Sequence, residues 1–327
     1  LDVDSFPSVV LRYKMMDRDL TIRTLDLTEQ QAAEIARRLI VNARPENKEY
    51  AYRHYLDNCC TRIRDLLDDV LGGAISEGRD EKPTDRTFRD WTERALEGLP
   101  VMQAIILFSL GPAIDKPITR FDEYFLPEVL AEDLDATRIG PDQRKLVKDT
   151  VYKVERKGPD VASEIPTWEL VVAIGVIAAL ALLLGLPLLL GRRKAGLRLA
   201  GAGIFLWGLI GGLGGLMLVL YWTITAHTDT HFNENLIVWP VLHLWLIGPG
   251  LKLLFTARLK ERTTKLLGWY MIASIGLIAV DVILKVGPFI QGNWGPILWA
   301  LLCDAGALLA LWRGGLLPRL LPKRAQS

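Results

Sequence analysis

Five long apolar stretches follow one another in the second half of the chain and constrain its fold more than any other feature. They are Trp168–Leu190, Leu197–Thr223, Leu236–Phe255, Leu266–Leu284 and Trp294–Trp312. A helix needs about 20 apolar residues to cross a hydrocarbon core of roughly 30 Å. The alternative is a set of buried helices in a large soluble core, but such cores do not typically present five runs of this length separated by short polar loops. We therefore predict an all-α bundle of five transmembrane helices at residues 166–327.

Lysine and arginine are unevenly distributed over the loops of this half. Ile224–Asn235 and Val286–Asn293 contain neither residue, whereas the first loop, the third loop and the C-terminal tail are basic. The basic residues are Arg192, Arg193, Lys194 and Arg198; Arg258, Lys260, Arg262 and Lys265; and Arg313, Arg319, Lys323 and Arg324. Because short cytoplasmic loops carry an excess of Lys and Arg, we expect a cytoplasmic C-terminus and an extracytoplasmic N-terminal half.

The N-terminal half is charged and has the pattern of an α+β domain, which we place at residues 1–134. Residues 135–165 lack clear periodicity and are expected to form a linker or stalk. Alternating residues predict strands at Val9–Tyr13, Thr21–Leu25 and Tyr50–Tyr55. Capping signals and helical periodicity predict helices that begin after Thr28 and at Cys59, and others at Thr87–Glu97, Val101–Leu110 and Pro127–Leu134.

Charge and cysteine content exclude some classes of function. The formal net charge of +1 gives no reason to expect a nucleic-acid partner. The three cysteines, Cys59, Cys60 and Cys303, cannot form a disulfide framework, and bridging the adjacent pair would strain the backbone, so free thiols are expected. The chain begins at Leu1 without a signal segment, and we expect it to be part of a longer gene product.

Polar residues in and between the apolar stretches are further candidates. His243, Asp281 and Asp304 fall inside them, where ionisable groups are costly and therefore functional candidates. Asp281 could instead reach the interface beside Lys285, and Asp304 could be structurally paired. In the loop Ile224–Asn235, His227 and His231 have the spacing of a zinc-binding pair on one helical face. The alternatives are a role at the membrane surface and a simple solvated loop.

The segment around Cys59 has the residues of a reactive site. A cysteine at a helix start meets unpaired N–H groups and the positive end of the helix dipole, both of which favour thiolate. Arg62 and Arg64 add positive charge nearby. These conditions are typical of a nucleophilic cysteine, although a small buried side chain is the alternative.

The stretch Asn58–Asp65 resembles the cysteine signature of the Lnb-type extracytoplasmic domain of bacterial lipoprotein transacylase B and its relatives. Supporting matches are Leu25–Thr28, Tyr50–Tyr52, Asp115–Ile118 and Phe125–Pro127. The five-helix module, with His227, Asn233 and Asn235 as membrane-surface candidates, resembles the module that accompanies this domain in many relatives.

The resemblance implies a papain-like, circularly permuted fold that is N-terminally incomplete here. It implies Cys59 as the nucleophile, with Asn58 fixing the turn or donating to an oxyanion and with Arg62, Arg64 and Asp65 in support. The histidine of the family lies in an upstream Gly-His element, which this chain lacks, and is expected before Leu1. His54 is an alternative base, or a half-buried strand residue.

The implied activity is that of an inner-membrane acyltransferase that acts on acyl esters of a lipid or lipoprotein through a thioester at Cys59. The expected partners are a membrane lipid or the N-terminus of a bacterial lipoprotein, and no cofactor or metal is expected. Two alternatives remain open. One is a membrane-anchored papain-like cysteine hydrolase (a peptidase or amidase), and the other is a non-enzymatic envelope scaffold or lipid sensor.

Overall fold

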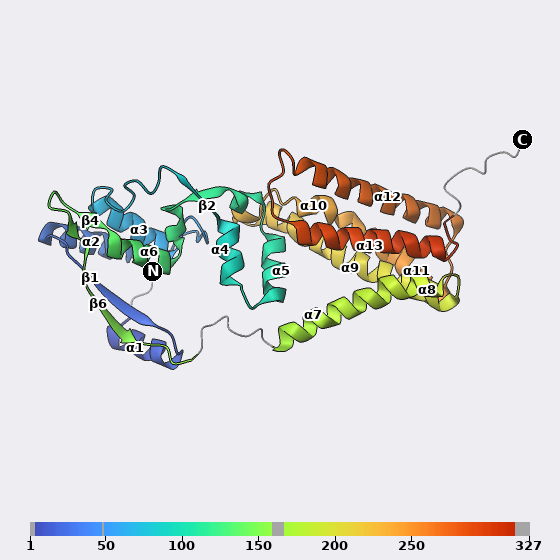
Figure 1. The fold of residues 1–327 in the computed structure, drawn as a ribbon, viewed down its shortest axis with the longest axis horizontal. Coiled ribbons are helices and arrows are strands. Elements are labelled where there is room, and N and C mark those ends of the chain that lie inside the picture. The colour runs from blue at the N-terminus through green and yellow to red at the C-terminus, as the bar shows by residue number, and fades with distance from the viewer. Residues whose placement is uncertain (1–3, 48, 159–166, 318–327) are drawn as a thin grey trace, which may run out of the picture. The chain divides into compact units, whose positions relative to one another are not determined.

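The computed structural model describes residues 4–47, 49–158 and 167–317 and divides the chain into two compact units (Figure 1). The first unit combines Leu1–Asp90 with Pro117–Ser163, and the second combines Trp91–Lys116 with Glu164–Ser327. This division differs from the expected one, because residues 91–116 cluster with the apolar helices and not with the N-terminal domain.

The first unit is a mixture of helices and short strands. Its helices are α1 (Phe6–Met15), α2 (Glu29–Asn42), α3 (Cys59–Val70), the start of α4 (Phe88–Ala95), the 3₁₀ turn η2 (Asp122–Phe125) and α6 (Pro127–Ala136). Its strands are β1 (Leu20–Leu25), β2 (Pro83–Thr87), β3 (Pro117–Thr119), β4 (Arg138–Ile139), β5 (Arg144–Lys145) and β6 (Val147–Val154). They form three antiparallel two-stranded sheets in the described ranges, so the mixed α and β character is confirmed.

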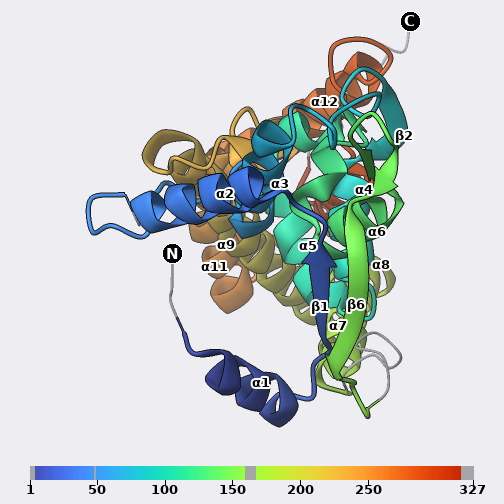
Figure 2. The same ribbon diagram turned by 90° about the vertical axis from the view of Figure 1, so that its left-hand side faces the viewer.

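The longest strand pair joins β1 to β6 (Figure 2). Both strands carry β-branched residues, and Ile22 lies opposite Val151 in an antiparallel register. Residues 135–165 are expected to form a stalk, but their described part contains β6. Through its pairing with β1, this strand belongs to the first unit. Its charged surface positions hide the alternation that marks an exposed strand.

Two other local predictions were wrong. Val9–Tyr13 lies inside helix α1, which Ser5 caps by accepting a hydrogen bond from the N–H of Ser8 and which has a proline in its first turn. Tyr50–Tyr55 forms no strand; a turn closed by two hydrogen bonds between Arg53 and Asp57 takes its place.

Three aromatic side chains form the core next to this turn. Tyr55 stacks on Phe88 with 4.7 Å between ring centroids, and Phe125 meets both rings edge-on at 5.3 and 5.4 Å. All three are buried. They fix the turn at 53–57 against η2 and thereby the start of α3.

The second unit is built from apolar helices. They are α5 (Pro100–Ser109), η1 (Pro112–Asp115), α7 (Thr167–Leu180), a π-helical segment η3 (Ala181–Gly185), α8 (Leu186–Leu190), α9 (Lys194–Ile224), η4 (Thr228–Thr230), α10 (Asn235–Val238), η5 (Val241–Leu246), α11 (Ile247–Thr256), α12 (Glu261–Leu284) and α13 (Trp294–Arg313).

Four stretches of the described chain are long and apolar enough to cross a membrane: Lys194–Ile224, Asn235–Thr256, Glu261–Leu284 and Trp294–Arg313. They coincide with four of the five predicted spans. The first predicted span, Trp168–Leu190, is helical as α7, η3 and α8, but only a shorter apolar piece, Ile174–Leu190, is recognised in it, and a fifth crossing stays a prediction.

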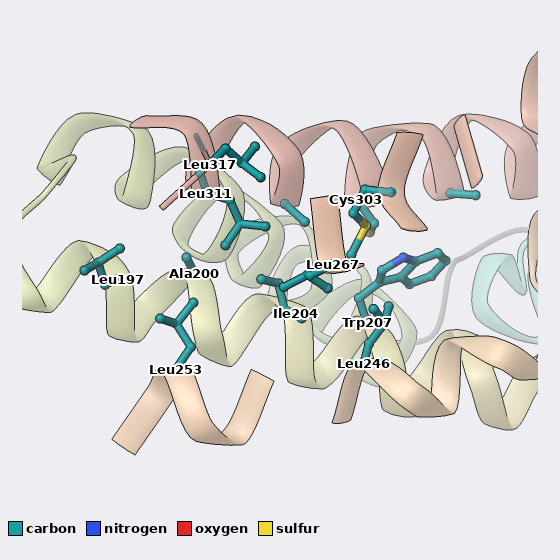
Figure 3. Packing of buried hydrophobic residues seen from close by; sticks show 14 of the residues in the cluster. Leu197, Ala200, Ile204, Trp207, Leu246, Leu253, Leu267, Cys303, Leu311 and Leu317 are labelled. Carbon is teal, nitrogen blue, oxygen red and sulfur yellow. The ribbon is translucent and has the colours of Figure 1, made fainter. Parts of the chain in front are cut away.

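The span Asn235–Thr256 is not one continuous helix but consists of α10, η5 and α11. Glycines of α9 leave space for the chain between these pieces. Figure 3 shows α9 packed through Leu197, Ala200, Ile204 and Trp207. A Cβ on Gly215 would lie 2.2 Å from the carbonyl oxygen of Trp239, just before Pro240. The glycines of α9 thus allow the close approach of this helix to its neighbour.

Candidate active site at Cys59

Cys59 is the first residue of α3, and its thiol is exposed. The turn at 53–57 precedes it directly, so the helix begins at a point fixed by the aromatic core. The exposed position contradicts the alternative in which this cysteine is a small buried side chain.

Asn58 caps the helix and holds it to the rest of the unit. Its Oδ1 accepts hydrogen bonds from the N–H groups of Cys60 and Thr61, both at 2.8 Å. Its Nδ2 donates to the carbonyl oxygens of His54 and Phe125, both at 2.9 Å. Because both amide hydrogens are used within the protein, Asn58 fixes the turn, and an oxyanion would have to displace one of these bonds.

One main-chain donor remains at this helix start. The N–H groups of Cys60 and Thr61 are taken by Asn58, and that of Arg62 donates to the Asn58 carbonyl. Among the described residues, none accepts a hydrogen bond from the Cys59 N–H. This donor is attached to the same residue as the thiol and points out of the helix start.

The two arginines of the motif differ in surroundings. Arg62 forms a two-point ion pair with Asp57, at 2.6 and 2.9 Å, and its guanidinium lies 3.6 Å from the ring centre of Tyr50. Arg64 is mostly buried, donates to Asp65 and to the carbonyl of Phe121, and lies over the Phe121 ring. Arg62 therefore lines the groove described next, whereas Arg64 and Asp65 do not.

A groove of about 1020 Å³ opens beside Cys59. It runs between the C-terminal half of α2 and the first turns of α3. Its apolar wall includes Leu39, Val41, Ile63 and Leu66, and its polar residues include Arg37, Arg38 and Arg62. Leu39 and Ile63 are exposed, which gives the groove an apolar surface next to the thiol.

The neighbouring cysteine is not equivalent to Cys59. Cys60 is buried, and this burial, followed by the nearby charge at Cys59, raises the pKa of its thiol to about 11. A thiol with this pKa stays protonated at neutral pH, so Cys60 is not a competing nucleophile.

Tyr52 lies just before the turn at 53–57, and the motif did not single it out. Burial raises the pKa of its hydroxyl, and the neighbouring Cys59 and Tyr50 raise it further. The only signal in the sequence was its place in the flanking match Tyr50–Tyr52.

The comparison with protein families addresses the first 94 residues. Residues 1–94 match the family model of the Lnb N-terminal periplasmic domain. The match contains Cys59 and ends inside α4. No curated protein and no solved structure matches the chain significantly. The match and the four candidate spans together support a multi-pass inner-membrane protein with an Lnb-like periplasmic domain.

Within the described residues, no histidine completes the site at Cys59. The His54 ring packs edge-on against Tyr55 and Phe125, with centroids 4.8 and 6.0 Å apart. In the described ranges no histidine forms a hydrogen bond with the Cys59 thiol. Nor do any three His, Cys, Asp or Glu side chains there gather as metal ligands.

The membrane-side candidates are placed differently from what we expected. Asn233 and Asn235 are buried, and both donate to the carbonyl oxygen of Phe108, at 3.0 and 2.9 Å. They hold α5 and do not face lipid headgroups. His227 is exposed and precedes the turn η4, so it remains a surface candidate.

The three ionisable candidates within the spans, His243, Asp281 and Asp304, are fully buried. Asp304 accepts a 2.7 Å hydrogen bond from the indole of Trp207, and His243 contacts the Tyr270 hydroxyl at 2.6 Å. Asp281 does not pair with Lys285 at an interface, because Lys285 contacts Glu234 at 2.5 Å. Structural pairing thus accounts for one oxygen of Asp304.

Proposed function

We propose that this protein is a membrane-bound acyltransferase in which Cys59 accepts an acyl group from an ester of a lipid or lipoprotein. The observation that carries the proposal is the arrangement of α3: an exposed thiol and an unoccupied N–H belong to the same first helical residue, and this residue borders a groove with one apolar wall. The match to the Lnb N-terminal periplasmic domain supports it.

The chemistry is nucleophilic acyl transfer. The Cys59 thiolate adds to the ester carbonyl carbon, and the developing oxyanion receives a hydrogen bond from the Cys59 N–H. The carbon–oxygen bond then breaks, the alcohol leaves with the proton that a base had taken from the Cys59 thiol, and a thioester remains on the sulfur. An amine attacks this thioester, loses a proton and displaces the thiolate, so that an amide forms and the enzyme is restored.

The groove suits a substrate with an acyl chain. Leu39, Ile63 and Leu66 offer apolar contacts, and the positively charged Arg62 lines the groove together with Cys59. The Arg62 charge is balanced by Asp57, so its part in the proposal is to position Tyr50 and the turn and not to attract an anion.

The proton steps require a base. The resemblance assigns this role to a histidine in a Gly-His element that this chain does not contain, and His54 is the alternative within the first unit. The proposal also includes a fifth span at Trp168–Leu190 and a cytoplasmic C-terminus. The orientation rests partly on the basic residues of the C-terminal tail, of which Arg319, Lys323 and Arg324 lie outside the described residues.

The test is an acyl-transfer assay with a diacylated lipoprotein labelled in one acyl chain, using the complete gene product in proteoliposomes. Cys59→Ala is expected to abolish transfer, whereas the matched variant Cys60→Ala keeps it. Release of free fatty acid without transfer to an amine would favour a hydrolase. Full transfer by Cys59→Ala would refute the proposal.

A further inference from the structure

Helix α5 has the composition of a membrane helix although it lies in the N-terminal half of the sequence. Eight of its ten residues, Pro100–Ser109, are apolar. Its two polar side chains make hydrogen bonds within the second unit: Gln103 donates to the carbonyl of Glu93, at 3.0 Å, and Ser109 to that of Ile105, at 2.8 Å. The helix therefore has no polar face for water.

No side chain of α5 is fully buried by the described part of the protein, although most of them are half-buried. Met102 is 41% exposed and Ile105 55% exposed. A helix that is apolar all round is normally covered, either by a protein core or by lipid.

The end of α5 is fixed to the loops between spans. The carbonyl oxygen of Phe108 accepts hydrogen bonds from Asn233 and Asn235, and that of Leu110 accepts one from Gln291, at 3.0 Å. Gln291 also donates to Asn233, at 3.0 Å, which joins the two neutral loops.

These loops lie at one end of the bundle. The first connects α9 to α10 and the second connects α12 to α13, so α9 and α12 both run towards this end (Figure 1). Phe108 packs on Trp239 with 4.8 Å between ring centroids, close to Gly214 of α9. Tryptophan is the side chain that typically marks the boundary between lipid and water. Helix α5 is thus held at the level where the spans leave the bilayer.

We propose that α5 is an interfacial membrane helix whose exposed side chains, Met102 and Ile105, contact the acyl chains of the surrounding lipids. Ten helical residues cover about 15 Å, half the hydrocarbon thickness, so α5 cannot cross. The chain enters this segment from the first unit at Trp91 and returns to it at Pro117, as a helix that dips into one leaflet requires. Lipid acyl chains then cover the apolar side chains that the protein leaves exposed.

The test uses a fluorescent nitrobenzoxadiazole label on single cysteines in the full-length chain, after Cys59→Ser, Cys60→Ala and Cys303→Ala. The protein is placed in phosphatidylcholine and phosphatidylglycerol vesicles, with doxyl groups on the acyl chains as lipid quenchers and iodide as a water quencher. Labels go on Ile105→Cys and Met102→Cys. Leu213→Cys, exposed on α9, serves as the lipid reference, and Tyr152→Cys, exposed on β6, as the water reference.

Labels at positions 102 and 105 are expected to be quenched severalfold more by the doxyl lipids than by iodide. The lipid reference at position 213 should behave in the same way, and the water reference at position 152 should be quenched mainly by iodide. Quenching by iodide as strong as at 152 would overturn the proposal. Protection from both quenchers would also overturn it, because protein would then cover α5. The result does not depend on Cys59, so failure here leaves the proposed acyl transfer untouched.

Discussion

The side chain of Asn58 donates a hydrogen bond to the carbonyl oxygen of Phe125, 67 positions later in the chain, at 2.9 Å. This bond joins two sequence features that seemed independent, the cysteine motif and the flanking Phe125–Pro127 match. Together with the bond to His54, it sets the direction in which α3 starts and thus where the Cys59 thiol is presented.

We expect Asn58→Ala to destabilise the first unit by about 2 to 3 kcal/mol, from the lost cap and the carbonyl oxygens left unpaired. Thermal unfolding in detergent measures this. Asn58→Asp keeps the acceptor for Cys60 and Thr61 but places a buried carboxylate oxygen against the carbonyl oxygens of His54 and Phe125, so it is expected to destabilise the unit as well. Equal stability of Asn58→Ala and wild type would contradict the structural role of this side chain.

The two adjacent cysteines should differ in reactivity. Iodoacetamide at pH 7 to 8 is expected to modify Cys59 and to leave Cys60 unmodified, because Cys60 is buried and its pKa is raised to about 11. Peptide mass spectrometry distinguishes the products in Cys59→Ser and Cys60→Ser. Rapid modification of Cys60 in the folded protein would show that the predicted burial is wrong.

Acid should weaken the first unit through Asp133. Burial alone would raise the pKa of Asp133, but hydrogen bonds from Arg120 and Tyr124 outweigh it, and the pKa lies below its ordinary value. A lowered carboxylate pKa stabilises the fold fully above about pH 4 and progressively less as the pH falls through the folded value.

Asp133→Asn should therefore cost about 2 kcal/mol at pH 7, and the difference from wild type should narrow below pH 4. Thermal unfolding between pH 7 and pH 3 measures both effects. A constant difference over this range would mean that the Asp133 charge does not stabilise the unit.

Glycines of α9 provide a test of the membrane unit. Gly215→Ala should lower the melting temperature, because its Cβ would lie 2.2 Å from the Trp239 carbonyl oxygen. Gly276→Ala on α12 is the matched control: nothing lies within 4 Å of its Cβ, and alanine favours the helix by about 1 kcal/mol. The same response of both variants would contradict the close packing of the broken span on α9.

Local signals predicted the helix starts on either side of the groove. The capping box of Thr28 and Gln31 predicts α2, and the apolar periodicity after Cys59 predicts α3, whose cap by Asn58 and Thr61 the structure adds. The sequence also predicts the four apolar spans, because length and composition alone define them.

The missed features depend on distant parts of the chain. Asn233 and Asn235 seemed to be surface residues because they lie in a polar loop, but their partner Phe108 is more than a hundred residues away. The pairing of β6 with β1 is equally remote in sequence, and no periodicity on the exposed β6 revealed it. Alternation at Val9–Tyr13 predicts a strand, but the cap at Ser5 and the proline that follows it start a helix there instead.

The most direct test of the account is the mass of the Cys59 peptide after the complete protein meets a diacylglyceryl ester without an amine acceptor. We predict an added acyl group on Cys59 that hydroxylamine removes, as it cleaves thioesters, and that persists in Cys60→Ala. An acyl group on another residue, or an unmodified Cys59 while the ester is consumed, would contradict the account.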